Sequence, residues 1–279
     1  MTTISELSPL RFCFKLMPVE EIQPWGEGEN CHLHWFGLTD GHYWISTPLG
    51  EALRYTDEIL KQWGGGSPYV DYQVVRFFED LQSVLPAALE PVPSDIAALI
   101  SDTGWFDRAE QWIVDKEDED ERWERRKLCC EAMDWYQERA LDSMHLTNGP
   151  MFHFWRTADK ITVRWEATGK NAEEVWSIPN GEFAVSAEQF SSAAYAFFDQ
   201  LVREMQVRVE TIRTKGWNRA DCRVNIPALV SEQQQRATGI SELKDRRTGT
   251  DWGNVRSLLQ RLPAELAKPA GLLQWRTEG

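Results

Sequence analysis

The chain has 279 residues, of which 42% are hydrophobic, and its 30 Lys and Arg against 44 Asp and Glu give a formal net charge of −14. This apolar content is too high for a disordered chain and supports one large domain or two smaller ones. No apolar run approaches the roughly 18 residues of a membrane-spanning helix, and no secretory signal is evident, so we expect a soluble, cytoplasmic protein. The charge argues against nucleic acid or a membrane surface as partner and favours a basic protein.

The cysteines and tryptophans further narrow the class of protein. Five cysteines, an odd number without C-x-x-C spacing, argue against a disulfide framework and predict reduced thiols. Fourteen tryptophans are spread along the chain. We expect most of them in the core, and exposed ones are candidate anchors for a partner.

The first third of the chain predicts strands followed by a helix. We expect a strand at 10–17, a hairpin at 31–47 that turns at Asp40-Gly41, and a short strand at 51–55. Apolar spacing predicts a helix over 69–85 that Pro86 ends or kinks.

The middle of the chain is helical and highly charged. Ser94 is a candidate N-cap for 95–101, and 107–144 reads as helix in one long piece or two. Six of the seven residues from Asp115 to Glu121 are acidic, and a basic stretch follows at 122–127. Such a pattern is typical of a solvated helix face with i,i+4 charge pairs.

The remaining chain repeats the order of strands and helices. We expect a hairpin at 151–168 and further strands at 173–178 and 182–185. A long helix is then capped by Ser186 and ended by Gly216 after Lys215. Beyond it we predict helices near 228–238 and 252–262, with residues 263–279 loosely attached.

Two strings suggest an internal duplication. FFEDL begins at Phe77 and FFDQL at Phe197, while Trp35 and Trp155 share the same spacing of 120 residues. Chance matching in a Trp-rich chain is the alternative. The predicted fold is α+β, with antiparallel β-hairpins packed against long amphipathic helices in two similar β-then-α halves. The expected boundaries are a first β-then-α unit at 1–101, a charged helical connection at 102–146, a second unit at 147–216 and a polar helical extension at 217–279, all of which could form one domain.

Catalytic and metal-binding patterns are weak. His32 and His34 fall on one face of a predicted strand, and His42 lies across the Asp40-Gly41 turn, so the three histidines are the candidate metal ligands. No G-x-S-x-G motif occurs, and no pair of carboxylates is isolated in an apolar segment. The sequence therefore predicts neither catalytic residues nor a cofactor.

Aromatic and acidic residues are the stronger candidates for a binding surface. Loop and strand-end positions provide a possible aromatic wall of Trp25, Trp44, Tyr69 and Tyr72. Asp71 is expected in the first turn of the helix, where it would either cap that helix or face a partner. The predicted acidic contacts with a partner are Asp115, Glu117, Asp118, Glu119 and Asp120.

Several strings resemble an uncharacterised bacterial family of the domain-of-unknown-function type. They are LHWFGLTDGHYWI (33–45), LRYT (53–56), PYVDYQVVRFFEDL (68–81), LEPVPSDI (89–96), ERALDSMHL (138–146) and FHFWRTADKITVRW (152–165). The resemblance covers residues 10–215 and transfers no activity or catalytic residue. Small acidic bacterial proteins of this kind are frequent among immunity proteins that neutralise secreted toxins.

Charge, missing catalytic signatures and this resemblance favour a non-enzymatic immunity protein that binds a basic toxin domain. Two alternatives stay open. One is a small-molecule- or metal-binding enzyme or sensor that uses the first hairpin, and the other is a subunit of an antiphage defence complex. The oligomeric state is not predicted.

Overall fold

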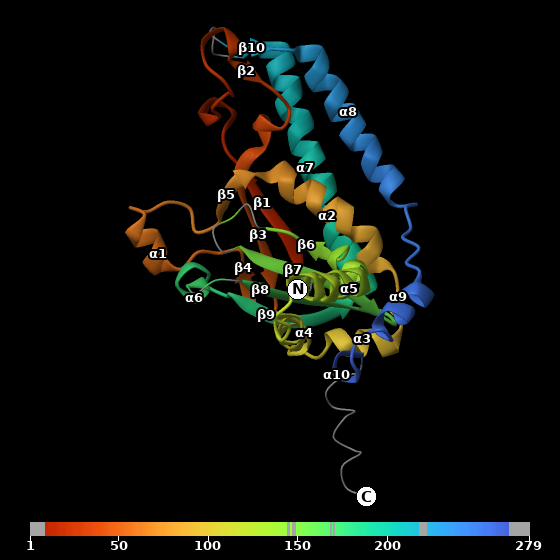
Figure 1. Ribbon diagram of the computed structural model, residues 1–279. Coiled ribbons are helices and arrows are strands. Elements are labelled where there is room, and N and C mark those ends of the chain that lie inside the picture. Colours follow the sequence, from red (N-terminus) through yellow and green to blue (C-terminus); the bar gives the residue numbers. More distant parts are fainter. Residues whose placement is uncertain are drawn as a thin grey trace, which may run out of the picture.

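The computed structural model describes residues 9–143, 146, 149–167, 169, 171–217 and 222–267. Antiparallel sheets and long helices alternate along the chain, which confirms the α+β class (Figure 1). Within these residues, the strands form two four-stranded sheets and one two-stranded sheet. None of the described helices is both long and apolar enough to cross a membrane.

The first sheet is built around one central strand. Strand β3 (Asp40–Thr47) pairs antiparallel with β1 (Arg11–Leu16) on one side, and with β4 (Gly50–Ala52) and β5 (Val70–Gln73) on the other. Burial alternates along the strands, so that Phe12 is in the core while its neighbour Arg11 is exposed. The sheet therefore has one apolar face and one polar face.

The expected hairpin turn at Asp40-Gly41 is wrong. Both residues begin β3, and the preceding segment contains three 3-10 turns and the short strand β2. The bounds are Val19–Glu21, Gly28–Asn30, Gly37–Thr39 and, for β2, His32–Leu33, which pairs in parallel with β10 (Arg223–Val224). A Cβ at Gly41 would lie 2.5 Å from the Lys15 carbonyl oxygen, so glycine is needed here for close strand approach and not for a turn.

The expected helix at 69–85 begins later than predicted. Residues Val70–Gln73 form β5, because their backbone pairs with β3, and helix α2 occupies Val74–Leu89. Pro86 lies inside the last turn of α2 and does not end it. Between β4 and β5 the chain forms the short helix α1 (Asp57–Gln62), which Thr56 caps.

The central charged region forms helices that pack beside the second sheet. After α3 (Ser94–Ile100), helices α4 (Trp105–Val114) and α5 (Glu119–Gln137) confirm the two-piece alternative for the charged stretch. The prediction is wrong for its last residues, because Ala140–Leu141 form a strand of the second sheet. Ser94 is already helical and its side chain makes no capping bond, so the predicted N-cap is wrong. Helices α9 (Trp252–Leu259) and α10 (Ala264–Ala267) join this group around a separate apolar cluster that includes Trp105 and Trp135.

The second sheet is a simple meander in the order β6-β7-β8-β9. Its strands are β6 (Ala140–Leu141), β7 (Pro150–Thr157), β8 (Lys160–Ala167) and β9 (Asn180–Ser186), so the predicted hairpin at 151–168 is confirmed. The strand expected at 173–178 is wrong: Ala172–Val175 forms helix α6, consistent with the helix propensity of its Ala and Glu residues.

Long helices follow the second sheet. A capping box between Ser186 and Gln189 begins α7 (Ala187–Lys215), and Gly216 ends it at φ 77°, as predicted. Helix α8 (Ile226–Leu243) then runs back along α7 (Figure 1). The expectation of a loose C-terminal end is wrong for residues 263–267, because Leu266 is buried and its carbonyl accepts a 2.8 Å bond from the Trp105 indole. Residues 268–279 lie outside the described part.

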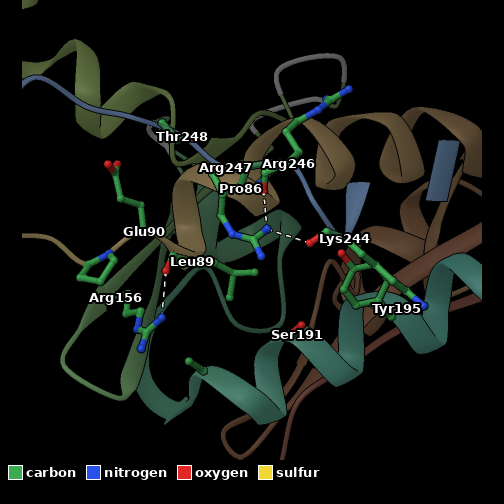
Figure 2. A pocket seen from close by; sticks show the side chains of 12 residues that line it. Pro86, Leu89, Glu90, Arg156, Ser191, Tyr195, Lys244, Arg246, Arg247 and Thr248 are labelled. Carbon is green, nitrogen blue, oxygen red and sulfur yellow. Dashed lines mark hydrogen bonds between the residues drawn. The ribbon is translucent and has the colours of Figure 1, made fainter. Parts of the chain in front are cut away.

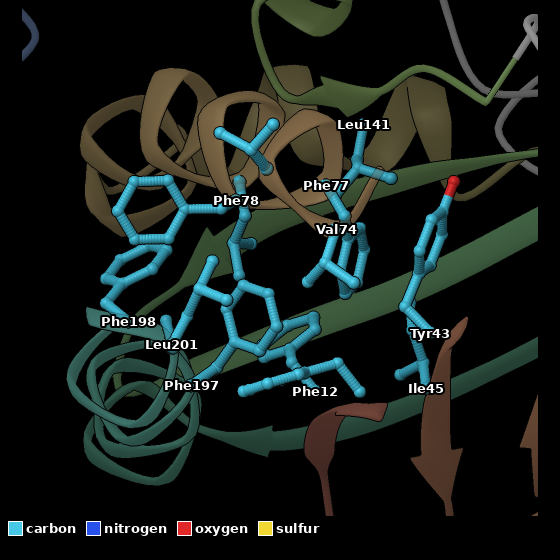
Figure 3. Close-up of a cluster of buried hydrophobic side chains, with 14 of the residues drawn as sticks. Phe12, Tyr43, Ile45, Val74, Phe77, Phe78, Leu141, Phe197, Phe198 and Leu201 are labelled. Carbon is cyan, nitrogen blue, oxygen red and sulfur yellow. The ribbon is translucent and has the colours of Figure 1, made fainter. Parts of the chain in front are cut away.

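The two units share a core and the order of strands followed by a long helix, although the strand order within their sheets differs. In each, antiparallel strands lead directly into a long helix, β5 into α2 and β9 into α7. The two repeated aromatic strings face each other, with ring centroids 5.2 Å apart for Phe77–Phe197 and for Phe78–Phe198 (Figure 3). Both sheets contribute to this cluster, so the two units pack around one common apolar core.

One part of the predicted repeat does not hold. Trp155 lies in β7, whereas Trp35 lies between β2 and β3 and donates a 2.8 Å hydrogen bond to Gln233 of α8. Phe12 in β1 and Phe154 in β7 are instead both buried in the core, with their ring centroids 6.4 Å apart. Trp35 and Trp155 therefore do not occupy equivalent places in the two units.

Candidate functional site

The aromatic residues expected to form one wall are divided among three places. Trp44 stacks on Tyr69 at 4.0 Å on the polar face of the first sheet, and the Tyr69 hydroxyl donates to Glu51. Tyr72 is on β5 and packs partly against the core. Trp25 is 43% exposed in the segment between β1 and β2, where its ring meets His34 edge-on. No contact among the described residues joins Trp25 to the Trp44–Tyr69 pair.

Asp71 is not at a helix N-terminus. It is an exposed residue in the middle of β5, directly opposite His42 of β3. The predicted interaction with a helix dipole is therefore wrong, because the extended conformation of 70–73 moves the helix start to Val74. Asp71 remains a candidate for contact with a partner on the open face of the sheet.

The histidines do not gather into a metal site. The rings of His32 and His34 lie 5.4 Å apart, but His34 Nδ1 accepts a bond from the Gly37 N–H and His32 Nδ1 lies 2.7 Å from the Asn30 carbonyl. His42 is on β3, and the turn that was expected to bring it near them does not form. Within the described residues, no group of three or more His, Cys, Asp or Glu side chains could hold a metal ion.

The predicted acidic residues form an exposed surface between α4 and α5. We call residues Val114–Trp123 the acidic corner. All six of its carboxylates, from Asp115 to Glu121, are exposed. Asp118 caps α5 by accepting a 2.9 Å bond from the Glu121 N–H.

Part of this negative charge is uncompensated. Lys116 pairs with Glu121 at 2.9 Å and Arg122 approaches Glu119 at 3.8 Å. Asp115, Glu117 and Asp120 form no ion pair with any described residue. The three carboxylates therefore remain available to a cationic partner.

Exposed apolar side chains lie at both ends of the acidic corner. Val114 is 48% exposed and Trp123 is 59% exposed. A groove of about 320 Å³ runs between α4 and α5 beside the corner, and Phe106, Cys130 and Met133 are among its lining residues. The corner thus combines negative charge with the kind of apolar anchor found at protein interfaces.

A second region has the opposite charge and was not predicted. A cavity of about 540 Å³ lies between the end of α2, the start of α7 and the segment that follows α8 (Figure 2). We call it the basic cavity, because four of its lining residues are cationic: Arg156, Lys244, Arg246 and Arg247. The string KDRR at 244–247 was a readable signal, but Arg156 reaches the cavity from β7 through the fold alone.

The fold and both surfaces describe an α+β protein of two units, each with an antiparallel sheet that leads into a long helix. The chain matches the family of unknown function DUF5984 over residues 11–258 and belongs to it. The match includes the acidic corner and the basic cavity, and it extends beyond residue 215, where the resemblance in the sequence strings ends. No curated protein and no solved structure matches the chain.

Proposed function

We propose that this chain is a non-enzymatic, cytoplasmic immunity protein that neutralises a toxin by binding its basic domain at the acidic corner. The supporting observation is the exposed run of six carboxylates that lies between the exposed side chains of Val114 and Trp123. Three of these carboxylates have no ionic partner within the described chain. The surface therefore provides both charge and an aromatic anchor.

The two components would act at different stages of binding. A net charge of −14 attracts a basic protein over long range, and the corner concentrates that charge at one place. Exposed ion pairs add little affinity, so the carboxylates should mainly set the association rate and its salt dependence. Trp123 should mainly set the dissociation rate, because burial of a large aromatic side chain supplies much of the affinity at an interface.

The first step of the test is to identify the partner. Tagged protein is captured from its native cells at low and moderate salt, and each captured basic protein is expressed with and without this chain. We expect one of these proteins to arrest growth alone and to be harmless in the presence of the chain. A captured protein that is harmless by itself, and stays bound in an obligate complex, would favour the defence-complex alternative and contradict neutralisation.

The second step uses matched charge variants. In one variant, Asp115, Glu117 and Asp120 become Asn, Gln and Asn. In the control, three exposed carboxylates elsewhere, Glu27, Glu29 and Glu58, become Gln.

Stopped-flow measurements with the captured partner should separate the two variants. We expect the corner variant to associate about tenfold more slowly at low salt, with a flatter salt dependence, while the control changes little. Trp123→Ala should raise the dissociation rate about tenfold or more. Equal slowing in both charge variants would show that only net charge matters and would refute the corner as the binding surface.

A further inference from the structure

We propose that the basic cavity binds a phosphorylated small molecule. The site is separate from the acidic corner and does not depend on the proposed toxin partner. Its phosphate groups would lie between Arg156 and Arg247, and a planar or apolar part of the ligand would rest on Tyr195 (Figure 2). A volume of about 540 Å³ is in the range of small-molecule sites, which is roughly 300–1,000 Å³.

The charge around the cavity is strongly positive in a chain that is otherwise acidic. The lining includes four cations and one carboxylate, that of Glu90. Glu90 is already engaged, because it accepts bonds from Arg139 at 2.6 Å and from the N–H and hydroxyl of Thr250. Asp245 is not among the lining residues, but its carboxylate is close enough to Tyr195 to act on that residue, which leaves four cations against two carboxylates. An anion in the cavity would therefore meet an excess of positive charge.

The two central guanidinium groups are held in place by backbone carbonyls. Arg156 donates to Ala158 at 2.7 Å and to Leu89 at 3.2 Å. Arg247 donates to the carbonyls of Lys244 and Arg246 at 2.7 and 2.8 Å. None of the four cations is in an ion pair with a described carboxylate. Arginine that is positioned in this way loses less conformational freedom when its planar guanidinium binds two oxygens of a phosphate.

The start of α7 completes the site. Ala187 and Ser191, in its first turns, line the cavity, while the N–H groups of Ala187 and Gln189 are already bonded to Asp159 and Ser186. The Ser191 hydroxyl can donate to a phosphate oxygen. One turn further, Tyr195 offers a ring face, and Lys244 Nζ lies 5.4 Å from its centroid. These groups favour a ligand with phosphate at one end and an aromatic group at the other.

The same phosphate chemistry occurs in inorganic pyrophosphate and in nucleotides, and titration calorimetry separates the two sources. The probes are pyrophosphate, ADP and GDP, with sulfate for comparison, all at low salt. We expect saturable binding at one site per chain for pyrophosphate and tighter binding for the nucleotides. Tyr195→Leu should weaken nucleotide binding and leave pyrophosphate binding unchanged. If pyrophosphate binds and the nucleotides bind no better, the ligand is a phosphate compound without a base.

Matched arginine variants locate the site. Arg247→Gln changes an exposed side chain, and Arg156→Lys keeps the positive charge but removes the planar guanidinium group, so both variants should fold. We expect each to weaken pyrophosphate binding about tenfold, whereas Arg203→Gln, an exposed arginine elsewhere on α7, has no effect. Absence of saturable binding for all probes, equal binding of sulfate and pyrophosphate, or an equal loss in the control would overturn the proposal.

Discussion

The acidic corner and the basic cavity have opposite charge and opposite construction. The corner is one continuous segment, Val114–Trp123, and nearly all of it is exposed. The cavity is assembled from the end of α2, the end of β7, the start of α7 and the segment after α8. The negative net charge of the chain agrees with the charge of the corner but gives no indication of the positive cavity. The reason is that a net charge sums over all positions, whereas the fold gathers the cations at one place.

This difference has a physical consequence. The carboxylates of the corner are largely solvated, so changing them should alter binding far more than stability. The cations of the cavity depend on distant elements that must be held together, so their geometry is tied to tertiary stability. Three predictions test this contrast, beginning with the largest effect.

The Glu90–Arg139 pair should be a major support of the cavity. Arg139 is fully buried, and Glu90 binds both Arg139 and Thr250, which ties the segment after α8 to the core. We expect Arg139→Met to cost about 3–5 kcal/mol in the free energy of unfolding, because it leaves Glu90 without its counter-ion. Urea unfolding measures this loss. A second substitution, Glu90→Gln, should recover part of it, and no recovery would mean that the pair's charge is not the cause.

His153 should report how firmly α5 is attached to the second sheet. Its ring stacks on Tyr136 of α5 at 4.0 Å, and burial, with a smaller contribution from Arg164, lowers its pKa to about 4. The unfolded chain therefore binds the proton first, and stability should fall as the pH drops from about 6.5 to 4, by about 3 kcal/mol in total.

A His153→Gln variant isolates this effect. Burial raises the pKa of Asp80 to about 6. Because the folded protein then binds the proton before the unfolded chain does, Asp80 should increase stability as the pH falls, which opposes the effect of His153. Asp80 is present in both proteins and cancels in their difference. We expect the stability of the wild type to decrease relative to the variant below about pH 6.5. Parallel pH profiles would show that His153 is accessible to protons in the folded state.

The smallest expected effect is a difference in stability between variants of two nearby carboxylates of the corner. Asp118 caps α5, whereas Asp120 is exposed in its first turn without an ion pair to a described residue. Asp118→Ala should lower the free energy of unfolding by about 1 kcal/mol, while Asp120→Ala should change it by less than about 0.5 kcal/mol. Thermal and urea unfolding measure both variants. Equal losses of stability in the two variants would show that the capping bond is not formed in solution.

Local signals gave correct predictions where neighbouring residues determine the structure. The second hairpin needs a two-residue connection at Ala158-Asp159, and α7 begins and ends with capping residues next to it in sequence. Predictions failed where distant backbone decides. Asp40-Gly41 has the composition of a turn but pairs with β1 and β5, and the apolar pattern after Tyr69 begins as a strand because β3 lies beside it.

The sequence by itself determined the α+β class, the long capped helix and the exposed acidic run, since each depends on residues within a few positions of one another. Only the tertiary structure decided that the two aromatic strings meet in one core. It alone also brought Arg156 beside Lys244 and Arg247. Composition and periodicity report local preference, whereas a cavity depends on which distant elements pack together to bury apolar surface.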